Sequence, residues 1–168
     1  MDFKHDILPL KNIIFRTALR IVLNREEAED IVQDTLLKLW ERRDELAQVE
    51  NLESFALTMA RNLAIDRKEK RENLNISFDD EKHDLPDEGQ GSSDSQLVKQ
   101  ETRGFIANII NALPEKQRTI LQLRDIEGKT YKEIATALSI SESDVKVTLF
   151  RARNEMKEKI LQKKSFFL

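Results

Sequence analysis

The chain of 168 residues is 35% charged and 6% aromatic, has a net charge of −3, and contains two histidines and no cysteine. This composition excludes a disulfide framework and a thiolate metal site, and it argues against a histidine-based zinc or catalytic centre. Nowhere do about 18 apolar residues run together, and the N-terminus lacks the apolar core of a signal peptide, so we expect a cytoplasmic protein without stable membrane insertion.

Three amphipathic helices are predicted in the first part of the chain. Apolar residues recur every three or four positions at 9–23, at 24–43 and at 51–72. Asn24 is the expected N-cap of the second helix, with Glu27 as its reciprocal partner in a capping box. Three such helices with short connections form a small bundle.

The segment at 73–95, NLNISFDDEKHDLPDEGQGSSDS, is acidic and serine-rich and has little apolar periodicity. Such a composition is typical of a flexible linker, here between a domain at 3–72 and a domain at 96–163. The expected fold is therefore all-α, with two small helical domains joined by a flexible acidic linker. Because acidic residues concentrate in the linker, the domains are close to neutral or basic, and the net charge does not exclude a nucleic-acid partner.

Four helices are predicted after the linker. The first spans about 97–112, and the second follows Pro114 over 115–125 and stops at Gly128. A capping box, Thr130-Tyr-Lys-Glu133, opens a short helix that reaches Leu138, and a similar arrangement at 141–144 opens a longer one.

The last two helices have the spacing of a helix-turn-helix. Apolar residues on both sides of the turn can share one core, and small Ala135 allows the helices to cross closely. The second helix then turns these residues outward, where such helices meet the major groove: Ser143, Lys146, Val147, Phe150 and Arg151. The alternative is a helical hairpin that packs on a protein partner.

Three stretches carry a family resemblance. ALPEKQRTILQLRDIEGKTYKEIATALSIS followed by VKVTLFRAR resembles region 4 of the extracytoplasmic-function class of the sigma-70 family, which reads the −35 promoter element. AEDIVQDTLLKLW at 28–40 and SFALTMARNLAIDRKEKR at 54–71 resemble region 2, which binds core RNA polymerase and the −10 element. The resemblance covers nearly the whole chain and implies a sigma factor.

The resemblance assigns roles in region 2. Asp30, Gln33 and Asp34 match positions that contact the coiled coil of the polymerase β′ clamp, and Leu37 and Trp40 would support that helix. The alternatives are that the two aspartates only solvate the helix and that Trp40 belongs to the core.

The third helix and the loop before it align with the family's −10 reader. The aligned residues of the helix are Arg61, Asn62, Asp66, Arg67 and Lys68, and the loop at 48–53 matches one that captures a flipped base of the non-template strand. Asn51 is the best candidate for contact with that base, or else it only caps the helix. Phe55 lies on the apolar face and is expected in the core.

In region 4, Lys146, Phe150 and Arg151 fit positions that contact the −35 element. Asp144, Val147 and Thr148 depart from the residues usual in the family, which leaves the preferred promoter sequence open.

The resemblance implies several partners: the β′ clamp coiled coil and β flap of core RNA polymerase, double-stranded promoter DNA, the non-template single strand and an anti-sigma factor. The linker is either only a tether or an acidic mimic of nucleic acid within a polymerase channel. The alternative function is a helix-turn-helix regulator that binds DNA without being a polymerase subunit. We expect no enzyme, cofactor or metal, because the sequence has no Gly-rich phosphate loop, no paired histidines and no nucleophile with a base.

Overall fold

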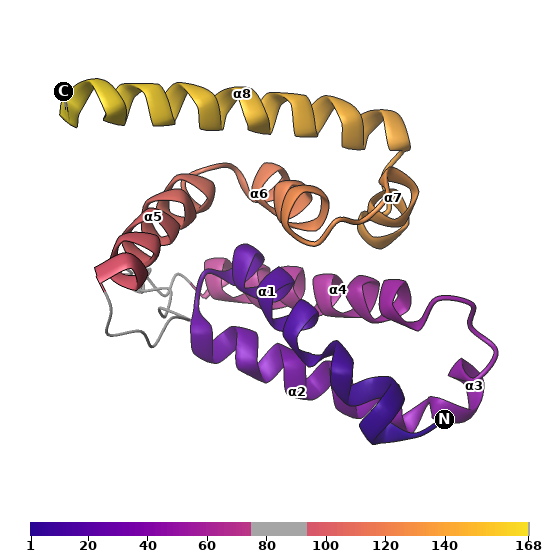
Figure 1. The fold of residues 1–168 in the computed structure, drawn as a ribbon. Coiled ribbons are helices and arrows are strands. Elements are labelled where there is room, and N and C mark those ends of the chain that lie inside the picture. Colours follow the sequence, from indigo (N-terminus) through magenta and orange to yellow (C-terminus); the bar gives the residue numbers. More distant parts are fainter. Residues whose placement is uncertain (75–93, 168) are drawn as a thin grey trace.

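A computed structural model describes residues 1–74 and 94–167 of the chain. Within these residues every regular element is helical (Figure 1), which confirms the all-α prediction. The main helices are α1 (Lys11–Val22), α2 (Arg25–Glu41), α3 (Arg43–Leu46), α4 (Leu52–Asn73), α5 (Asp94–Asn111), α6 (Glu115–Leu121), α7 (Tyr131–Leu138) and α8 (Glu142–Phe167). Most of the predicted linker, at 75–93, lies outside the described residues.

The first bundle consists of α1, α2 and α4. Its core holds Ile14, Ile31 and Leu39, each 0% exposed. Helix α4 contributes small residues at four-residue spacing, Ala56, Ala60 and Ala64, which are also 0% exposed. Because alanine projects only a methyl group, α4 can lie close against α1 and α2.

Asparagine side chains cap two helices of this bundle. Asn24 accepts a hydrogen bond of 2.9 Å from the N–H of Glu27, and Asn51 accepts one of 3.0 Å from the N–H of Ser54. The predicted reciprocal half of the first cap is wrong, since the carboxylate of Glu27 instead accepts a bond of 3.1 Å from Arg71. A distant arginine has replaced the local partner.

The chain before α1 is less regular than predicted. Pro9 lies in a short 3₁₀ segment, η2 (Leu8–Leu10), preceded by η1 (Phe3–Ile7), so α1 begins at Lys11. Helix α3 was not predicted.

The second bundle consists of α5, α6, α7 and α8, with Ile110, Ile120, Ile134 and Leu149 in its core. Helix α6 ends at Leu121, earlier than predicted, and continues as a wider turn, η3 (Gln122–Ile126). Gly128 follows with φ of +73°, a left-handed conformation that glycine adopts without strain. Helix α8 reaches Phe167, beyond the predicted domain end.

The helix-turn-helix prediction is confirmed. Thr130 and Glu133 form both bonds of the capping box, each 3.0 Å long. Ser139 ends α7 in the left-handed conformation, and the hydroxyl of Ser141 accepts a bond of 3.0 Å from the N–H of Asp144 in the first turn of α8. A short helix, a tight turn and a long helix therefore follow one another.

The two bundles contact each other along α1 and α4. In Figure 1, α6 and α7 lie between α8 and the pair α1 and α4. Two apolar side chains of the first bundle, Ile13 and Leu57, are 8% and 3% exposed and belong to the apolar core of the second. None of the described helices has an apolar stretch long enough to cross a membrane.

Candidate nucleic-acid and protein interfaces

One exposed face of α2 carries the four residues predicted to bind a protein partner. Asp30, Gln33, Asp34 and Leu37 follow one another at three- and four-residue spacing, so they lie on the same side of the helix. Leu37 is 58% exposed although it is apolar. An exposed leucine flanked by carboxylates is suited to a partner helix that offers apolar and basic side chains.

Trp40 lies at the end of this face but packs inward. It is half-buried against the first bundle, with the ring of Phe3 edge-on at 5.5 Å and the guanidinium of Arg43 over it at 4.2 Å. This packing favours the core interpretation of Trp40. Phe55, also half-buried, packs against the same core as expected.

The predicted DNA residues of α4 do not form one patch. Asn62 and Asp66 are exposed one turn apart, whereas Arg61 and Lys68 are half-buried. Arg67 instead faces α2, where its guanidinium lies 3.0 Å from the carboxylate of Asp34 and 3.4 Å from that of Asp30. Residues predicted for two different partners therefore share one ion-pair cluster.

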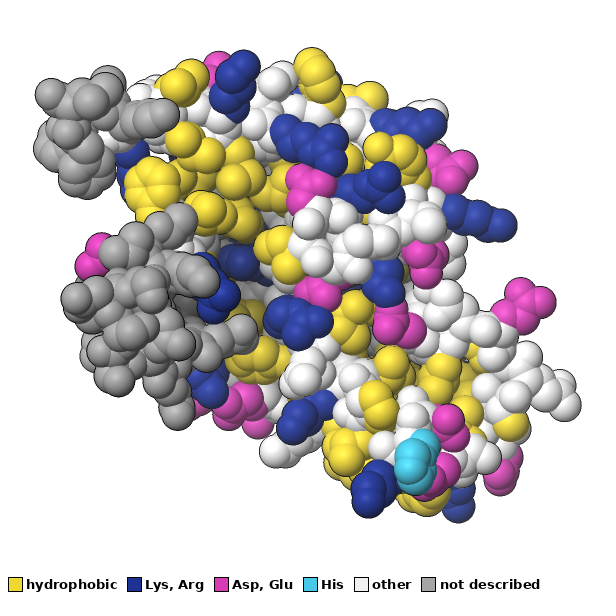
Figure 2. All heavy atoms as spheres, viewed as in Figure 1, with side chains coloured by type: hydrophobic (Ala, Val, Ile, Leu, Met, Phe, Trp, Pro, Cys, Tyr) yellow, Lys and Arg dark blue, Asp and Glu magenta, His cyan; other side chains and the backbone are white. Residues whose placement is uncertain are grey.

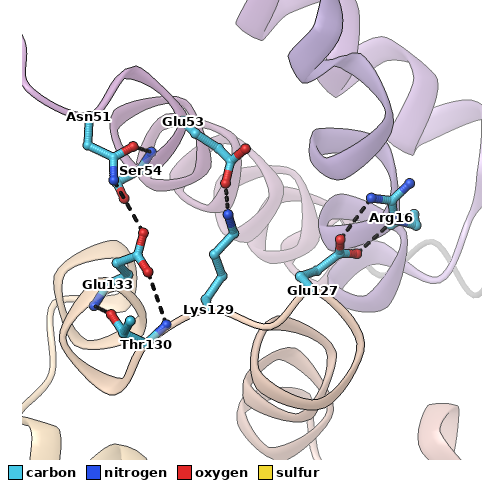
Figure 3. Close-up of polar contacts among 8 residues, drawn as sticks. All are labelled: Arg16, Asn51, Glu53, Ser54, Glu127, Lys129, Thr130 and Glu133. Atoms are coloured by element: carbon cyan, nitrogen blue, oxygen red, sulfur yellow. Dashed lines mark hydrogen bonds and ion pairs between the residues drawn. The ribbon is translucent and has the colours of Figure 1, made fainter.

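Asn51 lies at the start of α4, where its carbonyl oxygen caps the helix. Its amide nitrogen is exposed and donates a bond of 3.2 Å to the carboxylate of Glu133 in α7 (Figure 3). The capping role of Asn51 is confirmed, and contact with a base stays a prediction.

Of the predicted binding surfaces, the outer face of α8 has the largest number of exposed residues. Val147 is 47% and Phe150 67% exposed. They stand among exposed polar and basic side chains at helical spacing, namely Ser143, Lys146 and Arg151. Figure 2 shows Lys and Arg side chains along α8 and around α7, interleaved with acidic ones.

Two family models match the chain: Sigma-70 region 2 over residues 7–73 and Sigma-70, region 4 over residues 106–156. The chain belongs to the sigma-70 family. It is 28% identical to the ECF RNA polymerase sigma factor SigL of Mycobacterium tuberculosis over 83% of this chain and 78% of that protein. It is 29% identical to the RNA polymerase sigma-H factor of Pseudomonas aeruginosa over 96% of this chain and 83% of that protein.

Solved structures agree. The sigma factor RpoE of Bartonella quintana, in complex with the anti-sigma factor NepR, superposes with a TM-score of 0.73 at 25% identity over 94% of this chain and 95% of that one. The fold of CnrH, solved with the cytosolic domain of CnrY, gives a TM-score of 0.66 at 16% identity over 94% and 86%. The chain is a sigma factor of the extracytoplasmic-function class and directs transcription initiation, and nothing supports a regulator that acts without polymerase.

Two of the three residues predicted to differ from those usual in the family serve the structure of this chain. The carboxylate of Asp144 accepts bonds of 2.7 Å from Lys116 and 3.1 Å from Thr148, and the bond from Lys116 is the main cause that lowers the pKa of Asp144. Thr148 is only 6% exposed. Of the three residues, only Val147 is left on the outer face.

Sequence reasoning missed Arg118 of region 4. This side chain is 6% exposed, and burial lowers the pKa of its guanidinium. It donates to the backbone carbonyls of Leu113 at 2.8 Å, of Ile21 at 3.1 Å and of Arg20. One signal was present in the sequence, because three-residue spacing places Arg118 on the same side of its helix as Leu121.

Proposed function

We propose that this sigma factor binds core RNA polymerase through the α2 face and reads the −35 element through the outer face of α8. The observation that supports this is the pair of exposed faces, each with an apolar residue among charged ones, on separate bundles. It acts in the cytoplasm as a polymerase subunit rather than as an enzyme.

The α2 face suits the coiled coil of the β′ clamp. Leu37 supplies apolar area, and Asp30 and Asp34 attract a basic helix and fix its register. Arg67 pairs with both carboxylates in the free chain, but solvent-exposed ion pairs are weak, so a basic partner can replace it. The β flap is the proposed site for region 4.

The −10 element is proposed to bind the start and the outer side of α4. Asn51 would contact a flipped base through its amide nitrogen, since its carbonyl oxygen already caps the helix. Asn62 and Asp66, with Arg61 and Lys68 beside them, would contact the neighbouring strand, and Arg67 would join them once polymerase has occupied α2.

An anti-sigma factor is a further proposed partner. The RpoE structure that matches most of this chain is a complex with such a protein. A similar chain with the same arrangement of helices offers comparable surfaces to a related inhibitor.

Co-purification with core polymerase tests this assignment. Tagged chain mixed with purified bacterial core enzyme should elute with it in gel filtration, and Asp34→Ala should weaken the complex. If the chain binds promoter DNA by itself and never elutes with the core enzyme, the assignment is wrong.

A further inference from the structure

We propose that, in the free chain, the turn of region 4 between Lys129 and Glu133 occupies the −10-reading end of α4, while the α2 face stays open to polymerase. This inference rests on the proposed function of both faces. Region 4 and the −10 strand would then compete for the same end of α4, so region 4 must move away before α4 can bind the −10 strand.

Two polar contacts place the turn on α4. The amide of Asn51 donates to one carboxylate oxygen of Glu133, while the other oxygen accepts from the N–H of Thr130 (Figure 3). Beside them the ammonium of Lys129 pairs with the carboxylate of Glu53. The amide nitrogen proposed to contact a base is thus already bound.

The apolar contact lies directly behind this turn. Leu57, about one turn further along α4, is 3% exposed because it packs in the core of the second bundle, as does Ile13 of α1. Separating the bundles would expose both side chains to water, which opposes spontaneous opening.

A specific set of polar bonds fixes the docking. Arg16 holds Glu127 in a two-bond pair of 2.7 and 2.8 Å, and the Glu127 side chain is only 6% exposed. Arg20 adds a bond of 2.7 Å to Gln122, and Arg118 donates to Ile21. Paired donors and acceptors of this geometry define one register between the bundles.

The α2 face lies outside this contact. The side chain of Asp30 is 60% exposed, and Leu37 is 58% exposed. The closed chain can therefore meet the polymerase clamp but not the −10 strand. Polymerase binding would come first, and attachment of region 4 elsewhere on the enzyme would then uncover α4.

The absence of cysteine allows a direct test of the closed state. Glu26→Cys and Lys157→Cys, one exposed site on each bundle, would carry a donor and an acceptor dye. We expect high energy transfer in this reporter chain, lower transfer with Arg16→Glu added, and recovery in the Arg16→Glu/Glu127→Arg double variant. Breaking a partly buried pair should shift the closed-to-open ratio at least about tenfold.

Controls separate opening from unfolding. Arg153→Glu reverses a charge in an ion pair that lies within region 4 and should leave energy transfer unchanged. If Arg16→Glu loses the helical circular dichroism signal, Lys129→Glu serves as the opening variant instead, and Lys129→Glu/Glu53→Lys serves as the variant that should restore energy transfer. Equal energy transfer in the parent and in a folded opening variant would overturn the proposal.

A locked chain tests the functional consequence. The Arg16→Cys/Glu127→Cys variant can be cross-linked with a short bismaleimide. The cross-linked chain should bind core polymerase as well as the same variant without the cross-link does. Its affinity for single-stranded −10 DNA should be less than a tenth of the affinity of the variant without the cross-link. Unchanged DNA binding by the locked complex would refute the competition. Failure of both samples to bind polymerase would instead count against the proposed function.

Discussion

Arg118 in region 4 donates a hydrogen bond of 3.1 Å to the carbonyl oxygen of Ile21, the next-to-last residue of α1 in region 2. Arg71 donates a bond of the same length to the neighbouring carbonyl of Val22. The last carbonyls of a helix lack partners within it and carry partial negative charge, so two guanidinium groups stabilise this end. Because one of them comes from region 4, region 4 contributes to the stability of this end of α1.

Replacing Arg118 with alanine should lower the free energy of unfolding by about 2–3 kcal/mol, because buried carbonyls lose their donor. Arg118→Lys should recover only part, since one ammonium cannot match the planar fork of guanidinium. Urea denaturation followed by circular dichroism measures both. Arg153→Ala, which removes an exposed pair with Asp125, should cost under about 1 kcal/mol. Equal losses for Arg118→Ala and Arg153→Ala would contradict the role of Arg118.

Acidification should weaken the start of α7. The N–H of Thr130 bonds to the Glu133 carboxylate and is the main cause that lowers the pKa of Glu133. A lowered pKa stabilises the folded chain above the ordinary glutamate value of about 4.3, and this contribution disappears as pH falls through the folded pKa. The Tm of the parent should therefore exceed that of Glu133→Gln at pH 7, and the gap should narrow toward pH 3. A gap that does not change with pH would argue against an ionised cap.

The helices and the helix-turn-helix could be predicted from sequence because their signals are local. Apolar periodicity and the pair Thr130 and Glu133 need no distant partner to act. The reciprocal half of the Asn24 cap was mispredicted for the opposite reason: the Glu27 side chain is close enough in sequence to complete the box, but Arg71 from α4 binds it.

The contact between the bundles could not be predicted, because its members lie about a hundred residues apart. Arg16 and Glu127 have no sequence pattern that relates them, and each alone is typical of a solvated helix surface. For the sites, the family resemblance assigned residues that share one face of α2, and helical spacing predicted the outward face of α8. It did not predict that Arg67 turns from the DNA side of α4 toward Asp34.

We expect that truncating side chains of the α2 face lowers the affinity of the chain for polymerase. Leu37→Ala and Asp34→Ala should each weaken binding to core enzyme about tenfold, as for central residues of a protein interface. Fluorescence anisotropy of labelled chain titrated with core enzyme measures the change. Glu29→Ala, which removes an exposed acid about 80° from Leu37 and about 140° from Asp34 around the same helix, is the matched control. A loss in Glu29→Ala as large as that in Asp34→Ala would indicate general charge attraction instead of this face.

From the exposed, apolar side chain of Val147 we predict that the −35 element contains a thymine that this side chain contacts. An apolar side chain on the outer face of a recognition helix contacts the thymine methyl group, and this methyl is worth about 0.8 kcal/mol, or about fourfold in affinity. Replacing thymine by deoxyuridine at successive positions of a selected site should reveal one position with this loss. The loss should vanish in Val147→Ser, whose side chain has no methyl group, and persist in Val147→Thr, which keeps one. A scan in which the parent shows no sensitive position would remove Val147 from base contact.

Run-off transcription with purified core polymerase, on a promoter selected from a random library, tests the central claim that both faces act together in one sigma factor. The chain should support transcription, and Asp34→Ala should reduce it through weaker polymerase binding. Arg151→Ala should reduce it through a loss of about 1–3 kcal/mol in −35 binding, confined to certain −35 variants if Arg151 contacts a base and uniform if it contacts phosphate. Glu29→Ala should transcribe like the parent. No promoter-dependent transcript, or full activity in both Asp34→Ala and Arg151→Ala, would contradict the account.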